Sequence, residues 1–315
     1  MEYILLIFGI IILVAGGELL IRSAIALNNQ FDLSPLLIGT TVVAFGTSAP
    51  ELIVSIQASV SGNSDIAIGN VIGSNIANIG LVLGFLLLFK SIVINKKKYR
   101  MSYLVMFIAS VLFVLLSLDG SIGLFDGIVL VFGLILFLIL SFQGMKKVFT
   151  NEAVIQKIEV PKQLQLKLPV YEIVLCFVLG SIGLFIGSLL LVENAEIIAY
   201  NFGVSQYIIG VSVVALGTSL PELVTSIIAI IKGHNSISIG NIIGSNIFNI
   251  FAVLGISSII NPIRVDFFLY YVDMPIMIGF IVLLGLFLFM GKKIGLIEGL
   301  ALLIAYCSYM VFNFV

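Results

Sequence analysis

The chain has 315 residues, of which 61% are hydrophobic and 10% are charged, with a net charge of −1. A soluble domain carries about 25% charged residues, and the mean hydropathy here is +1.27. This composition excludes a water-soluble protein, including a soluble nucleic-acid-binding one, and predicts a chain that resides in the lipid bilayer.

Apolar runs of about 20 residues, long enough to cross a bilayer, follow one another from end to end. The first, MEYILLIFGIIILVAGG, lacks the positive start and the cleavage site of a signal peptide, so we expect a retained helix. We therefore predict an all-α polytopic membrane protein with ten transmembrane helices. The predicted spans are residues 3–27, 33–60, 66–90, 101–118, 122–145, 171–194, 205–231, 236–260, 267–290 and 295–314.

The second half of the chain repeats the first at an offset of 171 residues. GNVIGSNIANIG at 69–80 lies over GNIIGSNIFNIF at 240–251. Because each copy holds five spans, an odd number, the second copy enters the membrane with the opposite orientation, as in the inverted repeats of secondary transporters. The predicted units are a first five-helix repeat (1–145, motif 39–80), a linker (146–170) and a second, inverted repeat (171–315, motif 210–251).

Basic residues gather in the connections on one face of the predicted bundle. By the positive-inside rule this face is cytoplasmic, so we expect the linker inside and both termini outside a plasma membrane. The opposite connections hold Arg264 and otherwise acids such as Asp119, Glu196 and Asp266. The basic residues are Lys96, Lys97, Lys98 and Arg100 after the third span, Lys146, Lys147, Lys157, Lys162 and Lys167 after the fifth, Lys232 after the seventh, and Lys292 and Lys293 after the ninth.

The first predicted span carries the charged pair Glu18 and Arg22 at a spacing of four residues. Side chains four residues apart face each other on a helix, and long charged side chains can reach the membrane interface. We interpret the two as an end-of-helix ion pair or as side chains that extend to that interface, and a role in ion entry is the alternative.

Each repeat places a carboxylate beside a proline within an apolar span. The stretches are GTSAPE at 46–51 and GTSLPE at 217–222. Pro50 and Pro221 have no backbone N–H to donate, so we expect a break in each helix and backbone carbonyls, such as those of Ala44 and Thr47, turned toward a cavity. The polar residues of this first cluster share one helix face; they are Thr47, Ser48 and Glu51, and in the second repeat Thr218, Ser219 and Glu222.

A second polar cluster lies on the following span of each repeat, at steps of four residues. Neighbouring glycines allow close approach between helices. An asparagine here can serve either in helix packing or in the site itself. The sequence leaves the choice between these two roles open for Asn70, Asn75, Asn241 and Asn246. The cluster consists of Asn70, Ser74 and Asn78, and of Asn241, Ser245 and Asn249.

Together the clusters supply hard oxygen ligands, which suit Ca²⁺ and can hold Na⁺ but do not suit Zn²⁺ or Cu⁺. A charge at the bilayer centre costs at least about 2.5–3.5 kcal/mol, and no lysine or arginine lies at that depth in these spans. We therefore expect a transported cation to compensate Glu51 and Glu222. A purely structural role for these two carboxylates is the weaker alternative, and no cofactor is expected.

At these motifs the chain resembles the cation/calcium exchanger superfamily, and within it the sodium/calcium exchangers, which are built around GTS-x-PE and GN-x-IGSN-x-x-N/D. The resemblance covers essentially the whole chain and implies a prokaryotic-like exchanger without regulatory domains. It implies an ion-binding core of spans 2, 3, 7 and 8, and spans 1 and 6 that slide against it for alternating access. By this resemblance Ca²⁺ binds Glu51, Glu222 and the carbonyls of Thr47 and Thr218. The implied Na⁺ ligands are Ala44, Thr47, Ser48, Glu51, Ser74, Asn78, Ala215, Thr218, Ser219, Glu222, Ser245 and Asn249.

The resemblance also bears on ion coupling. An amide at Asn249, where potassium-dependent relatives have Asp, favours K⁺-independent transport. Calcium/proton exchangers carry an extra glutamate after GN, where this chain has apolar residues, so Na⁺ is favoured and a Ca²⁺/H⁺ antiporter is the main alternative. Two carboxylates balance one Ca²⁺, whereas three Na⁺ leave one positive charge, which predicts electrogenic exchange.

Two other classes of protein fit less well. A passive cation channel usually has a pore at an oligomer axis, whereas one chain here holds both half-sites and needs no oligomer for them. An intramembrane protease would require a histidine within a span or an HExxH motif. The sole histidine, His234, lies in a predicted loop, so we do not expect an enzyme.

Overall fold

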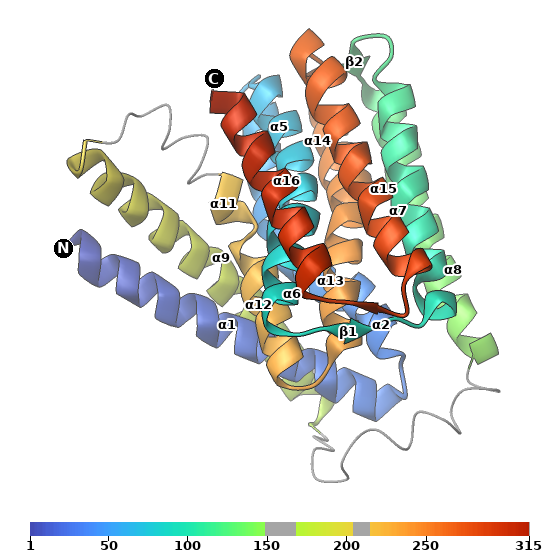
Figure 1. Ribbon diagram of the computed structural model, residues 1–315. Coiled ribbons are helices and arrows are strands. Elements are labelled where there is room, and N and C mark those ends of the chain that lie inside the picture. Colours follow the sequence, from blue (N-terminus) through green and yellow to red (C-terminus); the bar gives the residue numbers. More distant parts are fainter. Residues whose placement is uncertain (149–167, 204–214, 315) are drawn as a thin grey trace.

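The computed structural model describes residues 1–148, 168–203 and 215–314 (Figure 1). By length and composition, seven of its helices can cross a membrane, and residues 35–60 form a further candidate span bent by 46°. The predicted all-α membrane fold is confirmed. The beginning of the predicted span 205–231 and most of the predicted linker lie outside the described residues.

The elements of the two halves follow one another in matching order, except that the π-helical segment η7 of the second half has no counterpart before α7. Those of the first half are α1 (Glu2–Phe31), α2 (Pro35–Ile38), η1 (Gly39–Val43), α3 (Ala44–Thr47), α4 (Ala49–Val60), α5 (Ser64–Ala77), η2 (Asn78–Leu83), α6 (Gly84–Phe89), β1 (Ile92–Val93), α7 (Lys96–Leu116), β2 (Ser121–Ile122) and α8 (Leu124–Val148). Those described in the second half are α9 (Val170–Asn201), α11 (Ala215–Thr218), α12 (Leu220–Ile231), α13 (Asn235–Phe248), η6 (Asn249–Leu254), α14 (Gly255–Ile260), β3 (Ile263–Arg264), η7 (Leu269–Asp273), α15 (Met274–Met290), β4 (Lys293–Ile294) and α16 (Leu296–Phe314).

Helices α1 and α9 form a separate inclined pair beside the bundle of the other helices (Figure 1). With 30 and 32 residues they are about 45 and 48 Å long, more than the roughly 30 Å of a hydrocarbon core, so they must tilt to match it. Glycines bring the two backbones together: a Cβ at Gly16 would lie 2.6 Å from Leu184 N, and one at Gly187 would lie 2.5 Å from Leu13 N.

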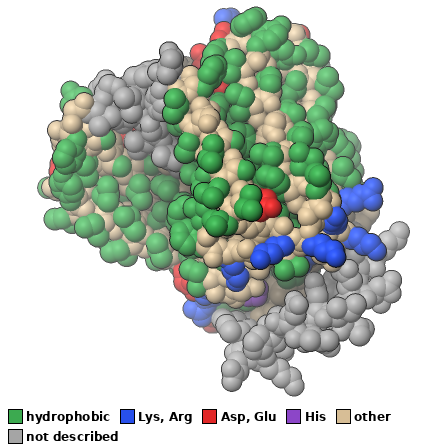
Figure 2. Space-filling view, viewed as in Figure 1, with side chains coloured by type: hydrophobic (Ala, Val, Ile, Leu, Met, Phe, Trp, Pro, Cys, Tyr) green, Lys and Arg blue, Asp and Glu red, His purple; other side chains and the backbone are tan. Residues whose placement is uncertain are grey.

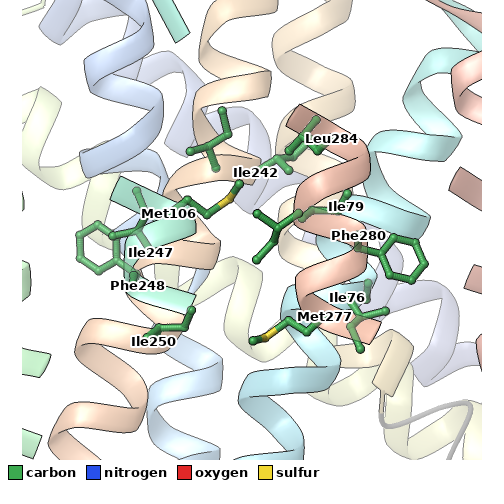
Figure 3. Packing of buried hydrophobic residues seen from close by; sticks show 14 of the residues in the cluster. Ile76, Ile79, Met106, Ile242, Ile247, Phe248, Ile250, Met277, Phe280 and Leu284 are labelled. Carbon is green, nitrogen blue, oxygen red and sulfur yellow. The ribbon is translucent and has the colours of Figure 1, made fainter. Parts of the chain in front are cut away.

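The bundle beside this pair has an apolar centre. Figure 3 shows Ile76 and Ile79 of the first half close to Met277 and Phe280 of α15, and Ile247 of α13 beside Phe248. All of these side chains belong to one buried cluster. This packing holds the helices that carry the polar motifs in fixed positions relative to one another.

Two short antiparallel ribbons join the halves at opposite ends of the bundle (Figure 1). Strand β1 pairs with β4, and β2 pairs with β3. The offset of 171 residues superimposes β1 on β3 and, with a shift of one residue, β2 on β4. The repeat thus exchanges one ribbon for the other. That exchange between opposite ends is what an inverted repeat requires.

The helix ends show the same correspondence. Asn261 Nδ2 donates to Ser59 O at 2.9 Å, and at the equivalent position Lys90 Nζ donates to Ile230 O at 3.3 Å. A cation near a helix C-terminus is favourable because the last carbonyls carry partial negative charge. Asn261, which follows α14, thus caps the end of α4, and Lys90, which follows α6, caps the end of α12.

Glu18 is not paired with Arg22. Its Oε1 lies 2.5 Å from Nζ of Lys232, which follows α12. The interpretation of Glu18 and Arg22 as a mutual pair is therefore wrong, because packing of α1 against α12 brings a cation closer than the neighbour on the same helix. This ion pair links the α1–α9 pair to the bundle.

We predict that Gly187→Leu destabilises the protein, because the added side chain would force α9 away from α1. Overpacking of this kind typically costs about 1–3 kcal/mol. Unfolding in detergent by heat or denaturant measures the effect, and Ile186→Leu, at a neighbouring position that is 42% exposed, is the matched control. Equal stability of the two variants would contradict the close contact.

Candidate ion-binding site

The two proline-containing helices break at equivalent serines. The chain leaves helical geometry at Ser48 (φ −85°, ψ 6°) and at Ser219 (φ −89°, ψ 0°). Pro50 and Pro221 then occupy the second position of α4 and α12, where the missing N–H costs no helical hydrogen bond. Each break places a glutamate, Glu51 or Glu222, in the first turn of the new helix.

The two carboxylates are both completely buried, at 0% exposure. Ser48 Oγ donates to Glu222 Oε1 at 3.4 Å, so the motif that carries Glu51 touches the carboxylate of the other half. The two motifs therefore meet at one centre inside the bundle. Neither glutamate forms an ion pair with any residue that the structure describes.

The hydroxyls of one half contact the second polar cluster of the other. Thr47 Oγ1 lies 3.2 Å from Ser245 Oγ and 3.2 Å from Asn241 Oδ1. In the opposite sense, Thr218 Oγ1 lies 3.3 Å from Ser74 Oγ. These contacts between halves bring most of the sequence-predicted hydroxyl ligands together.

The carbonyl of Ala44 is already engaged. It accepts from Ser48 N at 2.9 Å and lies 3.3 Å from Thr47 Oγ1. Ala215 begins α11, but its side chain lies outside the described set. An ion ligand at the Ala44 carbonyl would have to share the oxygen with these donors.

Asn70 and Asn241 support the site from within their own halves. Asn70 Nδ2 donates to Glu51 O at 3.1 Å and to Ser55 Oγ at 2.8 Å. Asn241 Nδ2 lies 3.1 Å from Thr225 Oγ1 and is also close to Ser226. The amides that the sequence left open between two roles thus fasten the third span of each half to the second.

Asn75 is another asparagine for which the sequence left the choice between helix packing and the site open. Its Oδ1 accepts from Asn249 Nδ2 at 3.2 Å, and its own amide lies 3.7 Å from Met277 Sδ. Asn78 and Asn249 each begin a π-helical segment, η2 and η6. Such local widening of a helix is frequent at functional sites. In the sequence, the only sign of this position was the asparagine that recurs in both halves.

Several buried oxygens at this centre have no hydrogen-bond donor among the described residues. A buried polar group without a partner is costly, and a buried charge more so. The unpartnered groups combine carboxylate, amide and hydroxyl oxygens, which are the ligands of Ca²⁺ and Na⁺. They are both oxygens of Glu51, Oε2 of Glu222, Oδ1 of Asn78, Oδ1 of Asn249 and Oγ of Ser219.

The described residues contain no group of three or more His, Cys, Asp and Glu side chains that could hold a metal ion. Structural zinc sites need four such ligands, and catalytic ones need three. The two carboxylates with their amide and hydroxyl neighbours suit a hard cation instead.

Glycines let α13 pack closely against the second span of the first half. A Cβ at Gly244 would lie 2.6 Å from Thr40 Cα, and one at Gly240 would lie 2.7 Å from Leu36 O. At the equivalent positions on α5, Gly69 and Gly73, an added Cβ would meet no atom of the described residues within 4 Å.

Comparison with known proteins agrees with this geometry. The family model described as sodium/calcium exchanger protein matches residues 1–143 and 172–315. The chain is 36% identical over 314 residues to the putative antiporter CaxA of Alkalimonas amylolytica, covering 99% of this chain and 98% of that protein. It is 30% identical to the sodium/calcium exchanger MaX1 of Methanosarcina acetivorans, covering 99% and 98% respectively. A solved structure of the sodium-calcium exchanger NCX_Mj, soaked without Na⁺ and Ca²⁺, superimposes with a TM-score of 0.83 at 29% identity and covers 99% of this chain and 98% of its own.

We predict that Glu51→Gln raises the stability of the ion-free protein, since it removes a buried charge whose two oxygens have no donor. The gain should be about 1–3 kcal/mol, and stabilisation by added Ca²⁺ should disappear. Melting temperatures with and without Ca²⁺ measure both effects.

The matched control is Glu298→Gln. Glu298 accepts from Gly295 N at 2.8 Å at the start of α16, so its replacement should not raise stability and should leave the response to Ca²⁺ intact. A Glu51→Gln variant that still responds to Ca²⁺ would show that Glu51 is not a ligand.

Proposed function

The chain belongs to the sodium/calcium exchanger protein family, and from this premise we propose that it is a secondary antiporter that exchanges Na⁺ for Ca²⁺ by alternating access. It is a multi-pass membrane transporter of cations and not an enzyme, and it needs no cofactor. The observation that carries the proposal is the pair of fully buried carboxylates, Glu51 and Glu222, which have no cationic partner among the described residues. A cation bound between them supplies the missing charge.

We assign Ca²⁺ to Glu51 and Glu222, assisted by the backbone carbonyls of Thr47 and Thr218. The unpartnered oxygens of both glutamates support this assignment. Na⁺ occupies flanking positions that share the same carboxylates, so the two ions compete for one negative charge. The remaining Na⁺ ligands in the proposal are Ala44, Ser48, Ser74, Asn78, Ala215, Ser219, Ser245 and Asn249.

Charge balance sets the response to voltage. Two ionised glutamates and one Ca²⁺ sum to zero, whereas three Na⁺ leave one positive charge. Moving one elementary charge across the membrane changes the free energy by about 2.3 kcal/mol per 100 mV. Exchange of three Na⁺ for one Ca²⁺ is therefore electrogenic in this proposal.

The choice of Na⁺ over H⁺ rests on the third and eighth spans. The positions just after each GN hold Val71, Ile72, Ile242 and Ile243, all buried and apolar, so no additional carboxylate is present there to carry a proton. Asn249 supplies an amide in place of a third carboxylate, which supports K⁺-independent transport. A Ca²⁺/H⁺ antiporter remains the alternative, in which Glu51 or Glu222 takes the proton.

For alternating access we propose that α1 and α9 move as a unit against the bundle. The two helices pack closely along their length, whereas α1 meets the bundle chiefly at α12 and through the Glu18–Lys232 ion pair. In the proposed orientation the ribbon of β1 and β4 faces the cytoplasm of a cell membrane, and both termini are outside.

We predict that proteoliposomes loaded with Na⁺ and diluted into Na⁺-free medium take up radiolabelled Ca²⁺. Uptake should ignore K⁺ and fall at least about 100-fold in Glu51→Gln and Glu222→Gln, because each removes half of the charge that holds the ion. The wild type with equal Na⁺ on both sides is the control. Uptake driven by a proton gradient alone would move the assignment to Ca²⁺/H⁺ exchange, and uptake without any counter-ion gradient would indicate a channel.

We also predict that Na⁺-driven Ca²⁺ uptake depends on the membrane potential. With potential set by K⁺ and valinomycin, an inside-positive potential should speed uptake, because one net positive charge leaves with each cycle. A rate independent of potential would contradict three-for-one exchange while leaving a two-for-one exchange possible.

A further inference from the structure

Two basic segments from distant parts of the chain are brought together by the ribbon of β1 and β4. Val93 pairs with Lys293, and Ile94 N donates to Lys292 O at 2.9 Å. Helix α7 begins three residues after β1, with Lys96 and Lys97 in its first turn. The side chains of all the basic residues concerned are exposed; they are Lys96, Lys97, Arg100, Lys292 and Lys293.

These cations have no carboxylate partner within the described part of the chain. The ion pairs found there involve only Met1 with Glu2 and Lys232 with Glu18. Lys96 and Lys97 also lie at the N-terminal end of α7, where the helix dipole is positive and disfavours cations. The lysines therefore do not stabilise the helix that carries them, and an external anion would relieve their repulsion.

Large apolar side chains surround the basic residues. Phe89, Val93, Met290 and Ile297 are between 75% and 79% exposed. Figure 2 shows a band of Lys and Arg side chains directly beside a surface dominated by hydrophobic ones. A charged band next to an apolar surface matches the level of phospholipid headgroups above their acyl chains.

The opposite ribbon shows that the fold does not need these lysines. It has the same antiparallel pairing, between β2 and β3. Yet the positions that the offset of 171 residues matches to the five basic residues hold no basic side chain; they are Phe267, Phe268, Tyr271, Ser121 and Ile122.

We propose that the surface formed by Lys96, Lys97, Arg100, Lys292 and Lys293 binds the anionic headgroups of phospholipids in the leaflet on its side of the membrane. Phosphate oxygens accept hydrogen bonds from the ammonium and guanidinium groups. The exposed apolar side chains contact the upper part of the acyl chains. Such binding fixes the depth of the ribbon in the membrane, and it does not depend on which ions are transported.

The test is binding to the purified protein in detergent, where the lysines cannot act through membrane insertion. The melting temperature is followed while phosphatidylglycerol, phosphatidylcholine or inorganic phosphate is added. We expect a saturable rise of about 2–4 °C with phosphatidylglycerol near tenfold above its Kd. We expect no comparable rise with phosphatidylcholine or with phosphate.

The variant Lys96→Gln/Lys97→Gln/Lys292→Gln/Lys293→Gln should bind phosphatidylglycerol at least about tenfold more weakly. The corresponding fourfold Lys→Arg variant and Arg264→Gln, on the opposite ribbon, should bind as the wild type does. If the fourfold Gln variant does not fold, the double variants Lys96→Gln/Lys97→Gln and Lys292→Gln/Lys293→Gln are measured instead. Each should lose part of the affinity for phosphatidylglycerol. Unchanged affinity on loss of the lysines, an equal effect of phosphatidylcholine, or an equal effect of phosphate would overturn the proposal.

Discussion

Two carboxylates, Glu51 and Glu222, are buried together in an apolar bundle, and no described residue forms an ion pair with either of them. The rest of this structure depends on that constraint. Each unpaired charge at that depth costs several kcal/mol, so the surroundings must be arranged for a cation. The helix breaks at Ser48 and Ser219 set the two glutamates in the first turns of α4 and α12. The amide of Asn70 donates its hydrogen bonds to the backbone oxygen of Glu51 and to the hydroxyl of Ser55. The carboxylate oxygens of Glu51 therefore remain available to an ion.

Much of this arrangement follows from the sequence because its physical signals are strong and local. Apolar runs of span length predict the helices, and the prolines of the GTSAPE and GTSLPE motifs predict the break in the second span of each half. The match at an offset of 171 residues predicts that each half contributes one glutamate. The contact of Ser48 with Glu222 and that of Thr218 with Ser74 agree with a shared centre.

Other features could not be predicted from the sequence because they depend on tertiary neighbours. The partner of Glu18 is Lys232, and no helical spacing relates the two. The π-helical segments that begin at Asn78 and Asn249 add one residue to a turn without changing the apolar pattern. Asn75 was read as equally suited to packing, and its bond to Asn249 appears only once both halves are placed. Strands of two residues, such as β1 and β4, have no periodicity from which to be predicted.

The ribbons also determine when during synthesis the protein can be completed. Strand β1 is made early, but its partner β4 lies just before the last helix, and β2 likewise waits for β3 in the other half. Thr47 contacts Ser245 of α13, and Ser48 donates to Glu222 of α12. Neither contact can form before those helices have been synthesised. Until the second half has been made, Glu51 and the polar residues around it therefore lack the contacts that the other half supplies. The site is complete only when both halves are present, so folding of the ion-binding centre depends on contacts between distant parts of the chain.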